Sequence, residues 1–234
     1  MSREGEGMMT GIIGAMRVEV DALKEQMTIA ATETVSGVEF CRGTLCGQEV
    51  VVAQCGVGKV FAAICAQTMI VRYGVDRIIN TGVAGSLCDR LGVLDIAVAD
   101  AVVQHDMDTS PLGDPVGLLS GINVVKIPTC ESLAARIETE ARAMGKTVVR
   151  GVIASGDQFI NSREKKAWIA STFDGIACEM EGAAIGHVCY VNGVDFAVIR
   201  SISDNASGEA DMEFPEMARR AAIQAQELML RVLA

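Results

Sequence analysis

The chain has 234 residues, half of them apolar, and a formal net charge of −10 at pH 7. This length and apolar fraction allow one large core, and α/β folds of this size often form a single domain. The negative charge and the lack of any basic run disfavour binding to nucleic acid or to an anionic membrane. We therefore expect the partners to be a small molecule and other copies of the chain.

No apolar run reaches the roughly 18 residues of a membrane span, and residues 1–10 lack the apolar core of a secretory signal. The eight cysteines are scattered without any C-x-x-C pair, which is typical of buried thiols in a reducing cytoplasm. Neither histidine stands at metal-ligand spacing from a cysteine pair. The sequence predicts a cytoplasmic protein with no metal and no cofactor.

Segments typical of strands and helices alternate along the chain, which predicts a largely parallel sheet covered by helices. The expected strands are 8–13, 40–45, 49–54, 77–80, 95–104, 148–154, 176–178 and 196–202. The expected helices are 19–27, 60–73, 131–144 and 216–233, with a further helix after Glu181. We expect one domain spanning 1–234, with 1–8 as a poorly structured extension.

The segment 106–128 holds three of the four prolines and is expected to be mostly loop. Long loops in compact domains are usually functional. This segment is therefore a candidate substrate or partner surface.

Glycine clusters follow two of the expected strands, in 11-GIIGAM-16 and 82-GVAG-85. The carboxyl ends of strands in an open α/β sheet form a ligand crevice. A third cluster, 56-GVGKV-60, resembles a phosphate loop but has Val60 where a Ser or Thr should hold magnesium. Tight strand-to-helix turns remain an alternative explanation for all three clusters.

Two carboxylates, Glu179 and Glu181, stand in the otherwise apolar run 176-IACEMEGAAIGHVCY-190. A carboxylate in an apolar interior is costly unless it is paired, so a structural donor or the hydroxyl groups of a ligand should meet these oxygens. Asp204 ends an apolar strand, and strand alternation places it on the same face as Arg200. For any single acidic residue, solvation or helix capping remains an alternative.

Taken together, these segments resemble the 5′-methylthioadenosine/S-adenosylhomocysteine nucleosidases of the nucleoside phosphorylase superfamily. The resemblance runs in the order of that family from about residue 9 to the last helix. It rests on 11-GIIGAMRVEV-20, 55-CGVGKV-60, 79-INTGVAG-85, 105-HDMD-108, 155-SGDQFIN-161, 178-CEMEGAAIGHVC-189 and 200-RSISD-204.

The resemblance implies a single-domain, three-layer αβα fold with a central mixed sheet, a homodimer, and hydrolysis of the N-glycosidic bond of a 5′-thioadenosine. It implies that Glu19 activates water and that Asp204 is the acid at adenine N7. Glu181 would hold the ribose hydroxyls with Met180 beneath the sugar. Glu179 would make a structural contact, although these two glutamates could have the opposite roles.

The remaining residues implied by the resemblance surround the same nucleoside. Phe159 would stack on adenine, Ile160 would offer its backbone to the adenine edge, and Arg200 would support the sugar end. Met16 and Phe214 would lie near the sugar and the 5′ tail. The loop Val83, Ala84 and Gly85 would complete the substrate site.

The chemistry is consistent with these carboxyl groups. Cleavage of an N-glycosidic bond needs a protonated leaving group and a nucleophile from the opposite face, as in an inverting glycoside hydrolase. Two carboxyl groups in different environments can act as acid and base at one pH. A third can accept both hydrogens of a vicinal diol.

Two departures from the family pattern concern Val83, where the family loop has serine, and 109-TSPLGDPVGLL-119, which in this family walls the 5′-thio pocket across the dimer. A phosphorolytic purine nucleoside phosphorylase is an alternative and would need arginines near the nucleophile; Arg17 is the obvious candidate. A futalosine-type nucleosidase and a nucleoside-binding module without catalysis are further alternatives. The module would be favoured if Glu19 or Asp204 pointed away from the pocket.

Overall fold

Strands of both directions combine into one mixed sheet in this computed structural model, which describes residues 7–204 and 214–234. Its strands are β1 (Thr10–Gly14), β2 (Thr28–Val35), β3 (Val38–Leu45), β4 (Gln48–Gln54), β5 (Arg77–Ser86), β6 (Ile96–Gln104), β7 (Ile127–Pro128), β8 (Val148–Ser155), β9 (Gly175–Glu179) and β10 (Asp195–Asp204). The α-helices are α1 (Asp21–Gln26), α2 (Lys59–Thr68), α3 (Glu131–Ala143), α4 (Arg163–Phe173), α5 (Gly182–Asn192) and α6 (Phe214–Leu233). Two 3₁₀ turns, Arg17–Glu19 and Ser110–Leu112, and a π turn, Met69–Tyr73, complete the regular structure of the described residues.

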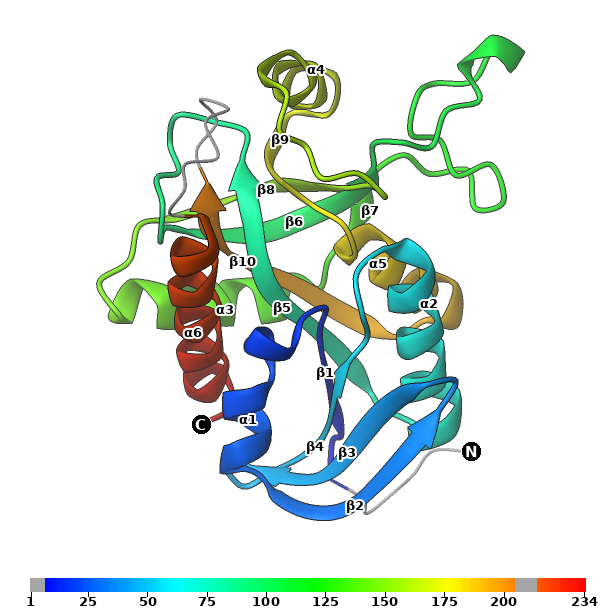
Figure 1. The fold of residues 1–234 in the computed structure, drawn as a ribbon. Coiled ribbons are helices and arrows are strands. Elements are labelled where there is room, and N and C mark those ends of the chain that lie inside the picture. Colours follow the sequence, from blue (N-terminus) through cyan, green and yellow to red (C-terminus); the bar gives the residue numbers. More distant parts are fainter. Residues whose placement is uncertain (1–6, 205–213) are drawn as a thin grey trace.

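The strand β5 is the centre of the sheet. It pairs in parallel with β1 and β10, and its end pairs antiparallel with β9. The path from β9 through β8 and β6 to β10 returns to β5, so these strands form a closed ring from which β1, β4, β3 and β2 extend. The carboxyl ends of β1, β5, β9 and β10 meet on one side of this ring (Figure 1).

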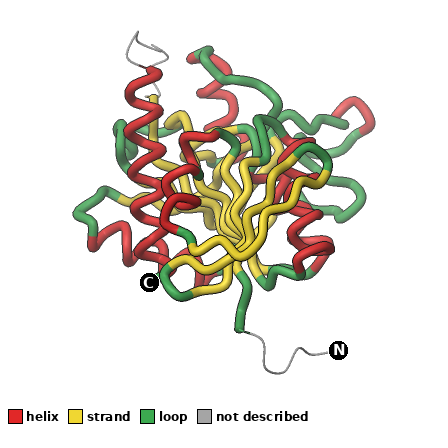
Figure 2. The backbone as a smooth tube through the Cα atoms, turned by 60° about the horizontal axis from the view of Figure 1, so that its bottom comes forward, coloured by secondary structure: helices red, strands yellow, loops and turns green. Residues whose placement is uncertain are grey.

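Helices cover both faces of the sheet, as Figure 2 shows. On one face α1, α3 and α6 bury a core that includes Leu23, Leu133 and Leu228. On the other, α2 and α5 bury Cys65 and Ala183 against the strands. The three layers confirm the α/β fold class with a central mixed sheet, whereas the predicted extent of the domain stays a prediction.

Most expected elements lie where the sequence predicted them. Gly74 and Gly145 each follow a helix with positive φ, as expected for helix ends. The alternative of a tight turn at residues 82–85 is wrong, because these residues continue β5. The helix predicted to begin at Glu19 begins at Asp21 instead.

Three of the described strands and α-helices, β2, the two-residue β7 and α4, were not predicted. The strand β2 is an edge strand whose residues are mostly exposed, so its sequence lacks a buried alternation. The helix α4 buries only Lys166, Ile169 and Phe173, too few for a clear apolar stripe. None of the helices within the described residues is both long and apolar enough to cross a membrane.

Candidate active site

A pocket opens where the carboxyl ends of β1, β5, β9 and β10 meet. It is lined by Ala15, Met16, Glu19, Val57, Val83, Ala84, Gly85, Gln158, Phe159, Ile160, Cys178, Glu179, Met180, Glu181, Ser203 and Asp204. Every predicted site residue is in this set except Arg200 and Phe214. Phe214 begins α6, but its side chain lies outside the described residues.

Glu19 is buried at one wall of the pocket and is held by backbone amides. The N–H groups of Ala15 and Met16 donate to Oε2 at 2.7 and 2.9 Å, and the N–H of Val83 donates to Oε1 at 3.1 Å. A Cβ on Gly82 would lie 2.6 Å from Oε1, so only glycine allows β5 to approach this carboxylate so closely. The glycine cluster therefore makes room for Glu19 rather than forming a turn.

The pKa of Glu19 is set mainly by its burial and not by a helix dipole. Glu19 ends a 3₁₀ turn of three residues, so the helix dipole is not its main environment. Burial raises the pKa of Glu19 above its ordinary value, and the hydrogen bonds from Met16, Val83 and Ala15 and the charge of Arg200 only partly offset this. Glu19 is therefore a stronger base than a solvated glutamate.

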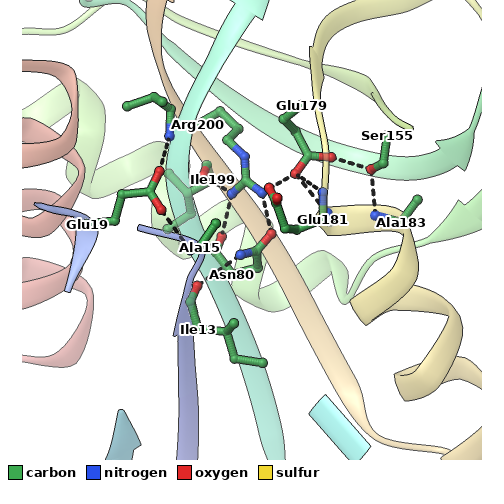
Figure 3. A network of polar contacts seen from close by, with 12 residues as sticks. Ile13, Ala15, Glu19, Asn80, Ser155, Glu179, Glu181, Ala183, Ile199 and Arg200 are labelled. Carbon is green, nitrogen blue, oxygen red and sulfur yellow. Dashed lines mark hydrogen bonds and ion pairs between the residues drawn. The ribbon is translucent and has the colours of Figure 1, made fainter. Parts of the chain in front are cut away.

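Glu179 belongs to a buried polar network beneath the pocket (Figure 3). It forms an ion pair with Arg200 and accepts hydrogen bonds from the Ser155 hydroxyl and from the N–H groups of Glu181 and Gly182. Burial alone would raise the pKa of Glu179, but Arg200 and these donors lower it below the ordinary value. These contacts favour the ionised form of Glu179, and its structural role stays a prediction.

Arg200 does not line the pocket, and it is not the partner of Asp204. Its side chain is 2% exposed and bonds to Glu179 and to Asn80 from behind the pocket wall. The expected Arg200–Asp204 face is wrong because the pairing register of β10 with β5 shifts between Ile202 and Asp204. This irregularity interrupts the strand alternation.

Glu181 is the carboxylate that remains available to a ligand. It holds the N-cap position of α5 without a side-chain capping bond, and one oxygen, Oε1, accepts from the N–H of Gly58 at 2.8 Å. Burial and the adjacent charge of Glu179 raise the pKa of Glu181 to about 7. Within the described residues, no donor contacts its second oxygen, so a hydroxyl group can reach it.

Asp204 stands at the end of β10, on the β5 wall of the same pocket. Its Oδ2 lies 2.8 Å from the ammonium of Lys166 on α4, and Oδ1 accepts a 3.3 Å hydrogen bond from the Ser203 hydroxyl. Sequence reasoning missed both partners. Ser203 adjoins the predicted acid, but the lone buried lysine of α4 gave no motif signal.

Part of the pocket lining is apolar. Phe159 and Ile160 follow β8, and Phe159 is 59% exposed, so a planar base could cover its ring. Met16 and Met180 supply further apolar surface. Val57 and Gln158 were missed although they lie inside the motifs 55-CGVGKV-60 and 155-SGDQFIN-161.

Arg17, the candidate phosphate ligand, faces away. Its side chain is 82% exposed and pairs with Asp21 at 2.8 Å. Within residues 7–204 and 214–234, the pocket lining includes four carboxylates and no arginine or lysine.

Known proteins are similar to this chain in fold and in sequence. Residues 10–234 match the family model of the phosphorylase superfamily. A 5′-methylthioadenosine/S-adenosylhomocysteine nucleosidase of Shewanella putrefaciens is 37% identical over 97% of this chain and 98% of its own length.

Solved structures give the same picture. A Helicobacter pylori methylthioadenosine nucleosidase mutant with 5′-methylthioadenosine in its active site is 36% identical, with a TM-score of 0.92 over 97% of this chain and 98% of that one. A Helicobacter pylori futalosine hydrolase is 37% identical, with a TM-score of 0.91 over 96% and 97%. The protein belongs to the phosphorylase superfamily and, within it, to the family of 5′-methylthioadenosine/S-adenosylhomocysteine nucleosidases, which are N-glycosyl hydrolases.

Proposed function

We propose that this protein hydrolyses the N-glycosidic bond of 5′-methylthioadenosine and S-adenosylhomocysteine, with Glu19 as the base and Asp204 as the acid. The observation that carries this proposal is the placement of two carboxyl groups, in different environments, on one pocket wall. Glu19 packs on Gly82 and Asp204 on Gly85. At about 3.3 Å per strand residue the two contacts are about 10 Å apart, which is close to the carboxyl separation of inverting hydrolases.

The base step follows from the setting of Glu19. A carboxylate with a raised pKa accepts a proton from water more readily than a solvated one. The amides that hold Oε1 and Oε2 fix its orientation. Water deprotonated here would attack the anomeric carbon while the bond to adenine N9 breaks.

The leaving group takes its proton from Asp204. The carboxyl of Asp204 would donate to adenine N7, so that neutral adenine leaves and a carboxylate remains. Phe159 would stack on the base, and the backbone of Ile160 would meet its edge, as both residues line the pocket. Glu181 would accept both ribose hydroxyls, and Met16 and Met180 would pack on the sugar. The place of Phe214 near the 5′ tail stays a prediction.

Phosphorolysis receives less support than hydrolysis. A phosphate dianion needs positive groups, but the described lining offers four carboxylates, and Arg17 is paired with Asp21 on the outside. The catalytic assignment also accounts better for the pocket than a binding module does, because Glu19 and Asp204 both line it.

Futalosine is a second candidate substrate, because a Helicobacter pylori futalosine hydrolase is 37% identical to this chain. The deciding experiment measures release of the free base from methylthioadenosine, S-adenosylhomocysteine, 5′-deoxyadenosine and futalosine by the purified protein. Release of adenine from the two thioadenosines supports the proposal. Base release from futalosine alone would replace the proposed substrate, and none from any of the four would contradict the reaction itself.

We further propose that the protein is a homodimer in a reducing cytoplasm. The packed pair α2 and α5 exposes an apolar face that includes Val60, Phe61 and Val191, which are 69, 52 and 56% exposed. The loop 106–128 also exposes Leu112, which is 83% exposed. Exposed apolar residues gathered on one helix pair are typical of a protein–protein interface. All eight cysteines are free thiols, which fits a reducing cytoplasm.

Sedimentation at assay concentration tests this assembly. We expect wild type to sediment as a dimer and Val60→Asp to shift towards monomer. Ile223→Asp on α6, where Ile223 is 39% exposed away from α2 and α5, is the matched control and should leave the dimer intact. An active wild-type monomer would overturn the assembly.

A further inference from the structure

Lys166 is a buried cation next to the proposed acid. It lies in the first turns of α4, and its side chain is only 4% exposed. Its ammonium lies 2.8 Å from Oδ2 of Asp204, whose side chain is 14% exposed. Lysine is almost never this buried without a charged partner, and Asp204 supplies one.

The placement is unfavourable for helix α4 itself. Positive charge near a helix N-terminus opposes the helix dipole, and burial adds a desolvation cost. The adjacent Lys165 is partly exposed and lies 4.3 Å from the ring centroid of Trp168. Lys165 thus stays on the helix surface, whereas Lys166 contacts Asp204 on the pocket wall.

We propose that Lys166 is a positioning residue for Asp204 in the glycosidic cleavage. This role rests on the proposed function, because it needs Asp204 to be the acid. Lys166 fixes Oδ2 and leaves Oδ1, whose partner among the described residues is the Ser203 hydroxyl at 3.3 Å, to face N7. When the proton moves from the Asp204 carboxyl to N7 and the bonding pair moves to N9, the ammonium stabilises the new carboxylate.

The wall behind Asp204 supports this geometry. A Cβ on Gly85 would lie 3.0 Å from Oδ2 and 3.1 Å from Oδ1, so the carboxyl group packs flat on the β5 backbone. The backbone blocks one side and Lys166 holds one oxygen. The rotation of the carboxyl group is therefore restricted before adenine binds, which favours proton transfer towards N7.

The test compares two leaving groups on one sugar. Adenine must receive a proton at N7 to leave, whereas 4-nitrophenolate leaves without one. We expect Lys166→Met to lower kcat on methylthioadenosine at least tenfold with KM changed less than threefold, as acid catalysis contributes about 10²–10⁴-fold. Its kcat on the 4-nitrophenyl glycoside of 5-methylthioribose should stay within threefold of wild type.

Lys165→Met is the matched control, since it removes the neighbouring charge from the same helix, and it should act as wild type on both substrates. Lys166→Arg should recover part of the lost adenine release. Should Lys166→Met fail to fold, Lys166→Gln, which keeps a donor but no charge, takes its place with the same expectation. Equal losses on both substrates, or no loss on either, would overturn the role of Lys166. A wild type that releases no adenine contradicts the proposed function instead.

Discussion

The N–H of Glu181 donates to Oε2 of Glu179 at 3.0 Å, so the buried carboxylate fixes the backbone of the one that faces the pocket. Glu179 in turn is neutralised by Arg200. These partners support the proposal that CEMEG combines a structural carboxylate, Glu179, with a ligand-facing one, Glu181. Within the described residues, no donor contacts the second oxygen of Glu181.

Glu181→Gln should weaken the use of ribonucleosides. Loss of a charged acceptor for the diol costs about 1.5–3 kcal/mol, so kcat/KM on methylthioadenosine should fall roughly tenfold to 150-fold. The same substitution should change little with a 2′-deoxy substrate, which lacks one hydroxyl. Glu164→Gln on the exposed side of α4 is the control. Equal losses with both sugars would remove Glu181 from the diol site.

Nucleoside binding should depend on pH through Glu181. Its pKa of about 7 means that it is protonated, and a weaker acceptor, below that pH. The dissociation constant of methylthioadenosine should therefore rise as the pH falls from 8 to 6. Titration of the slow Asp204→Asn variant separates binding from turnover. A rise of the same size in Asp204→Asn/Glu181→Gln would assign the pH dependence to another group.

Glu179→Gln should destabilise the fold, because it leaves the charge of buried Arg200 without its partner. Breaking a buried pair costs about 3–5 kcal/mol, measurable as a lower urea midpoint. Glu131→Gln is the matched control, because Glu131 is 76% exposed beside Arg150 and such surface pairs contribute at most about 1 kcal/mol. Similar midpoints for the two variants would show that the buried pair does not stabilise the protein.

Most residues of the pocket could be predicted from the sequence, whereas several of the contacts that hold them could not. The family resemblance assigned Glu19, Glu181 and Asp204 to one site, and all three line the pocket, because chain order brings the ends of the strands together. Lys166 could not be predicted, because its partner is 38 residues away and its helix carries no clear apolar stripe. The prediction that Arg200 and Asp204 share a strand face was wrong for a similar reason, since the register shift in β10 is set by pairing with β5.

Asp204→Asn should bind adenine and lose most turnover. Asparagine fits the same space but cannot deliver a proton to N7, and general acid catalysis contributes about 10²–10⁴-fold. The measurements are kcat on methylthioadenosine and the Kd of adenine by calorimetry. The pocket side chain of Val83 is apolar and cannot substitute as a donor. Near-normal kcat would move the acid to another residue.

The final prediction separates hydrolysis from phosphorolysis and depends on Glu19. Burial raises the pKa of this carboxylate above its ordinary value, and in its ionised form it can take a proton from water and also repel a phosphate dianion. Two like charges about 4 Å apart repel by roughly 4 kcal/mol at an effective dielectric near 20. No arginine or lysine within the described pocket lining offsets this repulsion.

Adenine release should therefore be indifferent to added phosphate, and the sugar product should be free 5-methylthioribose. Glu19→Gln should abolish turnover while the nucleoside still binds, because glutamine keeps the shape of the side chain but cannot accept the proton. Arg17→Gln is the control, since Arg17 is paired with Asp21 outside the pocket and its loss should leave both the rate and the phosphate response unchanged. Detection of a ribose 1-phosphate by phosphorus NMR, or a rate that rises with phosphate, would contradict both the base and the hydrolytic reaction.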